Sequence, residues 1–333
     1  MFKFGVFDLE DYRPAPSGFP GRLRWMLVRH RVSLRLLRTA IPASPVEIEV
    51  FEALMQGLRL NSGIYRTTFH NRFRNLDQFV NQFLAERYAP ADALEIHDWA
   101  ASDCLTSSEW AASLLPLFPE ARVAASDLSL FLVEVTQGVE TLIQERDGRP
   151  LQFISPSFVV NVNRPEQRPR WLTRLLLKRA RRVINEVQSR LNVPPEWLDS
   201  ASDSLSDPPY SLRKLPMVHP RAALFRSQDP RFEILRHSAF ESLLEPVDVI
   251  RTMNIFNLSY FDNPTLIEGA SAVWSSLKPG GVWIAGRTWQ EQPPSHNVSI
   301  FERTGRGFKL ARRYGEGSEI EALVLGLNPN ASG

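Results

Sequence analysis

Four groups of polar or small residues stand directly after apolar runs that have the length of buried strands. Residues 98–103 follow the first run, Asp127 ends the second, residues 237–239 follow the third, and Asn254 follows the fourth. In an open parallel sheet, ligands bind beyond the carboxyl ends of the strands. Small residues in the first group let the backbone approach a ligand closely, and a helix that begins after them favours an anionic group. The four groups therefore predict one ligand-binding site.

The elements that must position these groups are strands alternating with helices. Apolar runs predict strands over residues 93–100, 121–129, 231–238, 247–256 and 282–289. Helical spacing of apolar residues is present at 107–118 and 264–277, and the turn Lys-Pro-Gly-Gly at 278–281 precedes the last strand. Residues 297–315 predict a closing hairpin with its turn at 305–307. This alternation indicates an α/β fold with a mostly parallel sheet covered by helices on both faces.

The chain before this alternation has a different pattern. Apolar residues recur at helical spacing over 45–58 and again over 75–88. An Ala-Pro-Ala-Asp turn at 89–92 then ends the helical part. We therefore predict a helical N-terminal cap over residues 1–90 and a second domain over residues 91–333.

An insertion of about residues 137–230 separates the second and third predicted strands. Its first part predicts a hairpin at 139–155, and residues 171–191 predict one amphipathic helix. The tetrapeptide Asp-Pro-Pro-Tyr at 207–210 spells a motif of enzymes that methylate amino groups in nucleic acids. Because it follows the polar stretch SASDSLS and no apolar strand, we interpret it as part of a flexible loop.

Over roughly residues 92–325, the order and spacing of these pieces resembles the class I S-adenosylmethionine-dependent methyltransferases. In that family the first strand leads into an acid and a small-residue loop, and the second strand ends in an acid that binds both ribose hydroxyls. Asp127 matches the second acid, and LKPGGVWIAG matches the helix-turn-strand segment of the family. The resemblance implies a Rossmann-like seven-stranded methyltransferase sheet, S-adenosylmethionine as the cofactor, and an acceptor-facing insertion.

The resemblance also implies the site residues. The implied cofactor contacts are Asp98, Ala100, Ala101, Ser102, Asp127, Leu128, Ser238, Ala239 and Asn254. Residues 98–102 would hold the methionine end, residues 238–239 would lie by the adenine, and Asn254 would lie near the transferring methyl. Asp98 has a second interpretation, in which it caps backbone amides of the turn. A general base is needed only if the acceptor must lose a proton, and the candidates for catalytic residues are Asn254, Tyr260 and His296.

One departure from the family pattern bears on cofactor binding. The family loop carries glycines, whereas the matching positions here hold Ala100, Ser102 and Cys104, whose side chains reduce the room for a ligand. A non-catalytic binding protein that kept the fold and lost the cofactor is therefore an alternative. An NAD-type dehydrogenase is disfavoured, because the turn after the first strand lacks that glycine fingerprint.

Within the family, the layout is most similar to the chemotaxis-receptor (CheR-like) methyltransferases. Those proteins have a helical N-terminal domain and a long insertion between the second and third strands. Their fourth strand runs into an Arg-Asn-apolar-Tyr-Phe pattern, and VDVIRTMNIFNLSYF places Asn254, Tyr260 and Phe261 comparably at longer spacing. The acceptor itself is left open between a protein side chain and a small molecule.

Two arginine-rich stretches, at 21–39 and 168–182, interleave cations with Trp or Leu. They predict contact with an anionic partner, which is a membrane surface, a nucleic acid or an acidic substrate. In the other interpretation they are solvated helix faces whose arginine stems cover apolar surface. A nucleic-acid methyltransferase is therefore a further alternative.

The composition narrows the class of protein. A net charge of +2 and a charged fraction of 23% are ordinary for a soluble globular protein. The single cysteine, Cys104, excludes a disulfide framework and a cysteine-based zinc cluster, and no metal is predicted. No apolar run has the length needed to cross a bilayer, and the acidic start MFKFGVFDLEDY does not resemble a signal peptide. We therefore expect a cytoplasmic protein.

Overall fold

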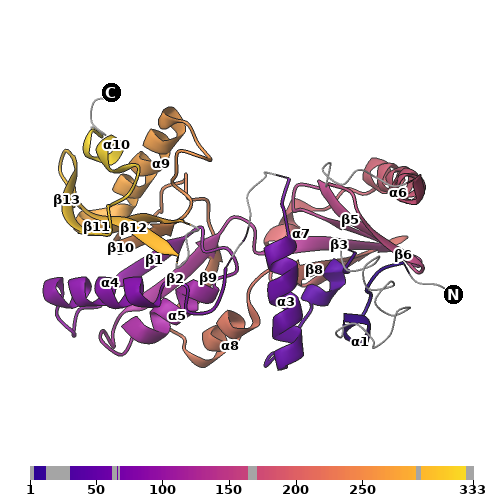
Figure 1. Cartoon of the computed structure of the whole chain (residues 1–333), viewed down its shortest axis with the longest axis horizontal. Helices are drawn as coiled ribbons and strands as arrows, with labels where there is room; N and C mark the ends of the chain where they lie inside the picture. Colours follow the sequence, from indigo (N-terminus) through magenta and orange to yellow (C-terminus); the bar gives the residue numbers. More distant parts are fainter. Residues whose placement is uncertain are drawn as a thin grey trace. The chain divides into compact units, whose positions relative to one another are not determined.

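The computed structural model of the chain describes residues 4–12, 31–61, 66, 68–163, 171–289 and 294–327. The chain forms two compact units, and each unit is made from two separate stretches of sequence (Figure 1). Unit 1 comprises Met1–Thr67 and Ser129–Pro220, and unit 2 comprises Thr68–Leu128 and Arg221–Gly333. Each unit has a sheet and a core of its own.

Unit 2 contains a seven-stranded sheet in the order β13-β12-β11-β10-β1-β2-β9. The strands are β1 (Glu95–Trp99), β2 (Arg122–Asp127), β9 (Phe232–Arg236), β10 (Val247–Met253), β11 (Leu277–Trp289), β12 (Ser295–Thr304) and β13 (Gly307–Tyr314). The first five of these pair in parallel, whereas β12 and β13 form the predicted antiparallel hairpin. The predicted α/β fold class with a seven-stranded sheet is therefore confirmed.

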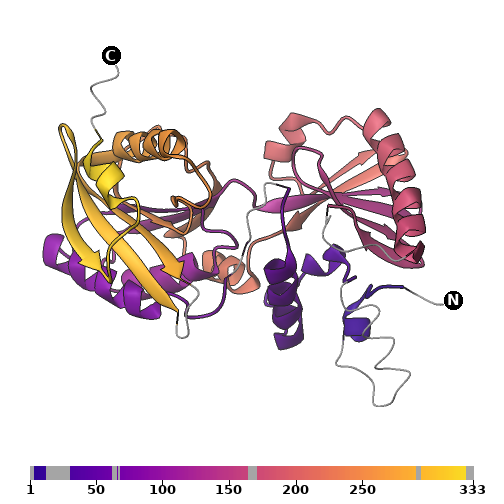
Figure 2. The ribbon, with the colours of Figure 1, turned by 45° about the horizontal axis from the view of Figure 1, so that its top comes forward.

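Helices cover both faces of this sheet (Figures 1 and 2). They are α4 (Arg74–Arg87), α5 (Leu105–Leu114), α8 (Pro220–Gln228), α9 (Asn263–Ser276) and α10 (Glu321–Leu325). Side chains alternate along β1, so Asp98 faces α4 and α5 while Trp99 joins the core formed with α9. The predicted turn at 278–281 is instead part of β11, because the strand continues through a bulge where its pairing with β10 shifts register.

The order of the strands reverses between β1 and β10. From β1 the chain continues to β2 and then β9 on one side, whereas β10 and β11 lie on the other side. Such a reversal places a crevice beyond the carboxyl ends of the two central strands. The segments after β1, β2, β9 and β10 therefore share this edge of the sheet.

Unit 1 contains a six-stranded antiparallel sheet in the order β6-β5-β4-β3-β8-β7 (Figure 2). The strands are β3 (Phe131–Gln137), β4 (Glu140–Gln144), β5 (Pro150–Ser155), β6 (Phe158–Asn161), β7 (Ser204–Asp207) and β8 (Tyr210–Pro216). One face packs against the 3-10 helix η1 (Leu34–Leu37) and α3 (Pro45–Gly57), and the other packs against α6 (Trp171–Arg190) and α7 (Pro195–Asp199). The short helix α1 (Leu9–Tyr12) belongs to the first of these two layers.

The division into two units differs from the predicted boundaries. The N-terminal segment is not a separate helical cap, because Val50, Phe51 and Leu54 of α3 share a core with strands of the insertion. Helix α4, which the prediction placed in the cap, belongs to unit 2. The insertion lies between β2 and β9 as predicted, although its compact part runs over Ser129–Pro220 and not over 137–230.

Four local predictions in unit 1 have different outcomes. The hairpin of β4 and β5 and the helix α6 are confirmed. Asp-Pro-Pro-Tyr forms the turn between β7 and β8, and the polar stretch before it is an edge strand where a flexible loop was expected. The first basic stretch, at 21–39, has helical spacing. Its residues 31–39 contain only the short 3-10 helix η1, and residues 21–30 lie outside the described residues.

Two wider expectations concern metals and membranes. Within the described ranges, no helix combines the length and the apolar character needed to cross a membrane. In the same part of the chain, no group of three or more His, Cys, Asp or Glu side chains could hold a metal ion.

Candidate functional site

The turn between β1 and α5 has an unusual backbone. Ala100, Ser102 and Cys104 have φ angles of 55°, 58° and 63°, which lie in the left-handed region. Residues other than glycine rarely adopt this conformation, because Cβ comes too close to the following carbonyl oxygen. These are the three positions at which the resemblance implied glycines. The turn therefore retains a glycine-type conformation with small side chains in place of glycine.

Asp127 ends β2, and its carboxylate lies against this turn. The Ser102 amide donates a hydrogen bond to Asp127 Oδ2 over 2.9 Å, and the Ala101 amide donates to the Ser126 carbonyl over 2.8 Å. The side chain of Asp127 is partly exposed, and the neighbouring Leu128 is 52% exposed. The structure thus brings together the predicted small-residue loop, the predicted acid and an exposed apolar side chain.

Asp98 is bonded through its carboxylate to side chains of neighbouring elements. Its carboxylate is buried, accepts a hydrogen bond from the Ser107 hydroxyl over 2.6 Å, and pairs with the guanidinium of Arg251 on β10. Arg251 is fully buried and also donates to Asp77 Oδ1 of α4 over 2.8 Å. No backbone amide of the turn is bonded to Asp98 among the described residues, so the capping interpretation does not match the structure, and the cofactor contact stays a prediction. Asp98 anchors the end of β1 to the neighbouring strand and to α5.

One buried arginine between two buried carboxylates leaves an excess negative charge. Burial raises the pKa of Asp77 to about 7, and the nearby carboxylates of Asp98 and Glu109 act in the same direction while Arg251 opposes them. The guanidinium of Arg251 lies 4.0 Å from the ring centroid of Trp110, so α5 also covers this cluster. The cluster joins α4, α5, β1 and β10 directly behind the turn.

Asn254 follows β10 with a φ angle of 64° and connects two strand ends. Its amide donates to the Gly286 carbonyl over 2.8 Å, and its side-chain Oδ1 accepts from the Thr288 amide over 2.7 Å. Asn254 therefore lies at the predicted edge, where its side chain already fixes the end of β11.

His296, a predicted catalytic candidate, has both ring nitrogens engaged. Nδ1 lies 3.1 Å from the Thr288 hydroxyl, and Nε2 lies 3.0 Å from the Arg72 carbonyl, to which it donates in the neutral ring. Burial lowers the pKa of His296. These contacts suit a residue that holds the segment before α4 against β12, and the role of His296 as a catalytic base stays a prediction.

Arg72 is a site residue that the sequence did not reveal. It is partly buried, and its charge is within electrostatic reach of Asp103 in the turn and of Tyr260 after β10. Burial lowers the pKa of Arg72, and these two groups oppose the shift. Tyr260, the remaining catalytic candidate, is 44% exposed. The segment before α4 carries no motif, so only the fold brings this cation to the strand ends.

The segment after β9 completes the edge. The His237 amide donates to the Asp127 carbonyl over 3.3 Å, and the His237 ring packs on Trp99 with a centroid separation of 4.7 Å. The Ser238 hydroxyl accepts from the Phe240 amide over 3.3 Å, and Ala239 is buried in the core beside Trp99. Burial lowers the pKa of His237. Burial also lowers the pKa of His97 to about 4, and the nearby His237 acts in the same direction. Both rings are therefore neutral at pH 7.

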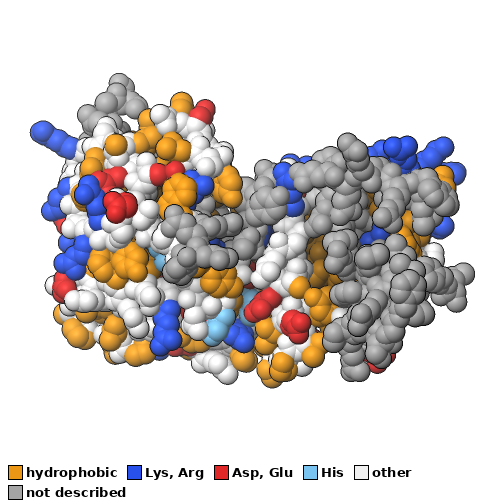
Figure 3. Space-filling view, viewed as in Figure 1, with side chains coloured by type: hydrophobic (Ala, Val, Ile, Leu, Met, Phe, Trp, Pro, Cys, Tyr) orange, Lys and Arg blue, Asp and Glu red, His pale blue; other side chains and the backbone are white. Residues whose placement is uncertain are grey.

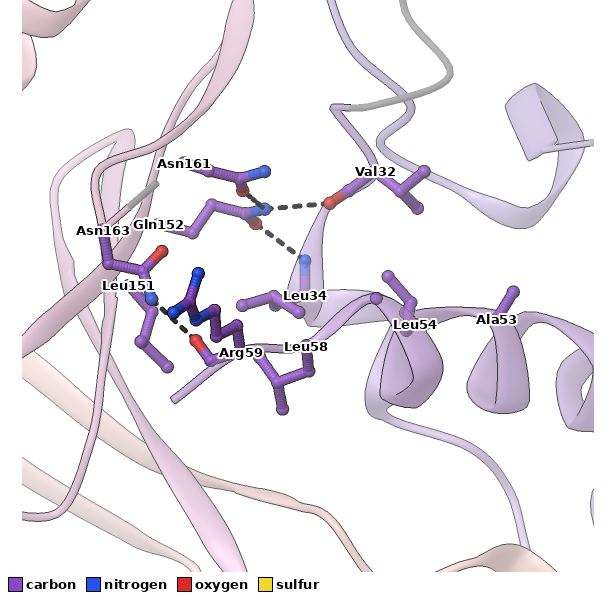
Figure 4. A pocket seen from close by; sticks show the side chains of 11 residues that line it. Val32, Leu34, Ala53, Leu54, Leu58, Arg59, Leu151, Gln152, Asn161 and Asn163 are labelled. Carbon is purple, nitrogen blue, oxygen red and sulfur yellow. Dashed lines mark hydrogen bonds between the residues drawn. The ribbon is translucent and has the colours of Figure 1, made fainter. Parts of the chain in front are cut away.

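Unit 1 holds a pocket of ≈ 170 Å³ between the N-terminal segment and strands β5 and β6 (Figure 4). The buried amide of Gln152 accepts from the Leu34 amide over 2.8 Å and donates to the Val32 carbonyl over 2.9 Å. Asn163 donates to the Arg59 carbonyl over 2.7 Å. These amides attach the N-terminal segment to the sheet, which is a structural role.

No protein-family model and no curated protein matches the sequence. Among solved structures, the sugar N-methyltransferase KedS8 from Streptoalloteichus is 12% identical, with 73% of this chain and 74% of that chain covered and a TM-score of 0.30. The SAM-bound amino pentose methyltransferase CalS10 from Micromonospora echinaspora is 13% identical, with 80% and 78% covered and a TM-score of 0.30. An O-methyltransferase family protein from Burkholderia thailandensis is 12% identical, with 74% and 42% covered and a TM-score of 0.28. These neighbours are methyltransferases, and at such identities and TM-scores they do not establish what this chain binds.

Proposed function

We propose that unit 2 is an S-adenosylmethionine-dependent methyltransferase domain that acts on a protein side chain or a small molecule. The observation that carries the proposal is the left-handed turn of Ala100, Ser102 and Cys104, held by the carboxylate of Asp127. A strained turn of small residues persists only where the surrounding structure fixes it, and such turns concentrate at ligand sites. Here it lies at the point where the strand order reverses.

Each predicted contact takes a role in this proposal. Asp127 would accept hydrogen bonds from the ribose hydroxyls, and the exposed side chain of Leu128 would cover the adenine together with residues 238–239. The turn at 100–102 would lie along the methionine end. Asp98 would act only through the turn, because its carboxylate is bonded to Arg251 and Ser107.

When bound, the cofactor would supply a methyl group on a sulfonium: a nucleophilic atom of the acceptor would bond to the methyl carbon, and the thioether S-adenosylhomocysteine would leave. The chain would contribute alignment and exclusion of water. Asn254 would act by positioning β11, since its side chain is bonded to the Thr288 amide. Among the three catalytic candidates, Tyr260 would meet the acceptor, and its exposure and its electrostatic interaction with Arg72 support this role.

Calorimetry with S-adenosylhomocysteine tests the proposal. We expect saturable binding to the full chain, complete loss in Asp127→Ala, and a clear weakening in Asp127→Asn, which keeps one acceptor for Ser102 but loses the charge. Asp248→Asn is the matched control, because this carboxylate is at the opposite end of a strand in the same sheet and pairs with Lys278. Absence of binding by the wild-type chain would support the alternative of a fold without the cofactor. Unchanged affinity in Asp127→Ala would remove the ribose assignment alone.

Two finer predictions accompany the proposal without carrying it. The likeness to chemotaxis-receptor methyltransferases rests on the insertion between the second and third strands of the sheet and on the segment after β10. A cytoplasmic location also stays a prediction. The methyl acceptor would be identified by methylation of candidate proteins and small molecules with a labelled cofactor.

A further inference from the structure

Helix α6 has two sides of opposite character. One side packs on the sheet of unit 1, where Ala180, Ile184 and Val187 are buried in a core that includes side chains of β6. The other side is exposed and carries Arg174, Lys178, Arg181 and Arg182. These four residues, termed the α6 basic face, have spacings of four, three and one residues, so they follow one side of the helix over about 12 Å.

Within the described part of the chain, the α6 basic face has no acidic partner, whereas two other cations of the same helix do. Arg179 pairs with Glu140 at 2.8 Å, and Arg190 pairs with Glu186 at 3.1 Å. None of the four residues of the α6 basic face has an ion pair with any residue that the structure describes. Cations gather visibly over α6 in the space-filling view (Figure 3). Four like charges held together without acids favour a polyanionic partner.

The first arginine-rich stretch behaves differently. Arg35 pairs with the buried carboxylate of Glu134 at 2.7 Å, and Arg38 pairs with the same carboxylate. Arg31 lies 4.3 Å from the ring centroid of Phe4 and donates to the Val159 carbonyl. The described arginines of that stretch therefore hold unit 1 together, and the case for an anionic partner rests on α6.

The chemistry of the α6 basic face favours phosphodiesters over a membrane. An interfacial helix buries its apolar side in lipid, whereas the apolar side of α6 is already buried in protein, and Leu175 is its only large apolar side chain that is mostly exposed among the described residues. Three of the four cations are arginines, which bind phosphate oxygens in a bidentate manner. A length of about 12 Å corresponds to roughly three or four phosphates along one strand.

We propose that the α6 basic face binds the phosphate backbone of a nucleic acid without reading its sequence. The inference rests on unit 1 alone and does not depend on cofactor binding in unit 2. Neutralising four phosphates of a duplex predicts a slope of about −3.6 for the logarithm of the binding constant against the logarithm of the salt concentration. Raising salt from 50 to 200 mM should then weaken binding by about 150-fold.

Fluorescence anisotropy of a labelled 20-base-pair DNA duplex with the full chain tests this proposal, in the absence of cofactor. The variant Arg174→Gln/Lys178→Gln/Arg181→Gln/Arg182→Gln should lose this salt-dependent component, and each single substitution should reduce the slope by about 0.9. Replacing the three arginines by lysine keeps the charge and should preserve the slope. Arg179→Gln and Arg190→Gln remove paired cations from the same helix and should change the slope little. Circular dichroism verifies that the variants are folded.

Three results would overturn the proposal. The first is an absence of duplex binding by the wild-type chain at 50 mM salt. The second is an unchanged slope in the folded quadruple variant. The third concerns vesicles of 30% phosphatidylserine in phosphatidylcholine. If the wild-type chain binds them but does not bind the duplex, and the quadruple variant loses vesicle binding, the α6 basic face is assigned to a membrane surface.

Discussion

The buried cluster behind the turn leads to a prediction that reverses the usual effect of breaking an ion pair. Asp77 and Asp98 share one guanidinium, and all three side chains are at most 8% exposed. The pKa of Asp77 is raised from 3.8 to about 7, chiefly by burial. The native protein therefore keeps a proton on Asp77 in a pH range where the unfolded chain releases it. The stability that this proton contributes is complete below pH 3.8 and is lost as the pH rises through about 7.

The magnitude follows from the shift. About three pKa units correspond to about 4 kcal/mol of the free energy of unfolding between the two limits. Asp77→Asn copies the protonated side chain and keeps an oxygen for Arg251, which still has Asp98 as its charge partner. We expect the variant to match the wild-type chain near pH 4 and to exceed its free energy of unfolding by about 4 kcal/mol near pH 8.

Urea denaturation followed by tryptophan fluorescence, repeated between pH 4 and 8, measures this difference. His97 has a lowered pKa of about 4, so it contributes stability above pH 6.5 that is lost as the pH falls towards 4. That contribution is common to both chains and cancels in the comparison. Glu95→Gln, which removes an exposed carboxylate on β1, is the control for a neutralising substitution in the same sheet. A loss of 2 kcal/mol or more in Asp77→Asn at pH 8 would refute the reasoning, because it would mean that an ionised Asp77 is stabilising.

The remaining predictions concern the same region. Ala100→Gly should raise the free energy of unfolding by about 0.5–1 kcal/mol, since relief of about 1–2 kcal/mol of left-handed strain exceeds the entropy that glycine adds to the unfolded chain. Ala100→Val should lower the free energy of unfolding. Equal losses in both variants would contradict the left-handed conformation of the turn. Arg251→Leu should cost about 3–5 kcal/mol at pH 7 by leaving two buried carboxylates without a counter-charge. Adding Asp77→Asn should recover part of that loss in a double-mutant cycle, and strict additivity would show that the two residues do not interact.

Much of unit 2 could be predicted because its signals are local. Apolar runs gave the strands of its sheet, and the small residues after β1 indicated the turn that Ala100, Ser102 and Cys104 form. The pairing of Asp98 with Arg251 could not be predicted, because the two residues are 153 positions apart in the chain and no spacing connects them. Arg72 was missed for the same reason, since only tertiary packing places it near Asp103.

Unit 1 was harder to predict. Its sheet ends at β7, a short and largely exposed strand whose polar sequence has no apolar alternation, so it was interpreted as a loop. The boundary at residue 90 was wrong about α3 because a helical pattern shows that one side is buried but not what covers it. Glu134 shows the same limit, since its pairing with Arg35 joins the N-terminal segment to the inserted sheet.

The central claim is that an adenosyl cofactor lies over the turn after β1 and meets the carboxylate at the end of β2. A crystal structure of the chain soaked with S-adenosylhomocysteine tests it most directly. We predict electron density for the ribose within hydrogen-bonding distance of Asp127 and for the amino-acid end along Ala100–Ser102. Density elsewhere, or a carboxyl edge of the sheet that stays empty at saturating ligand, would contradict the account.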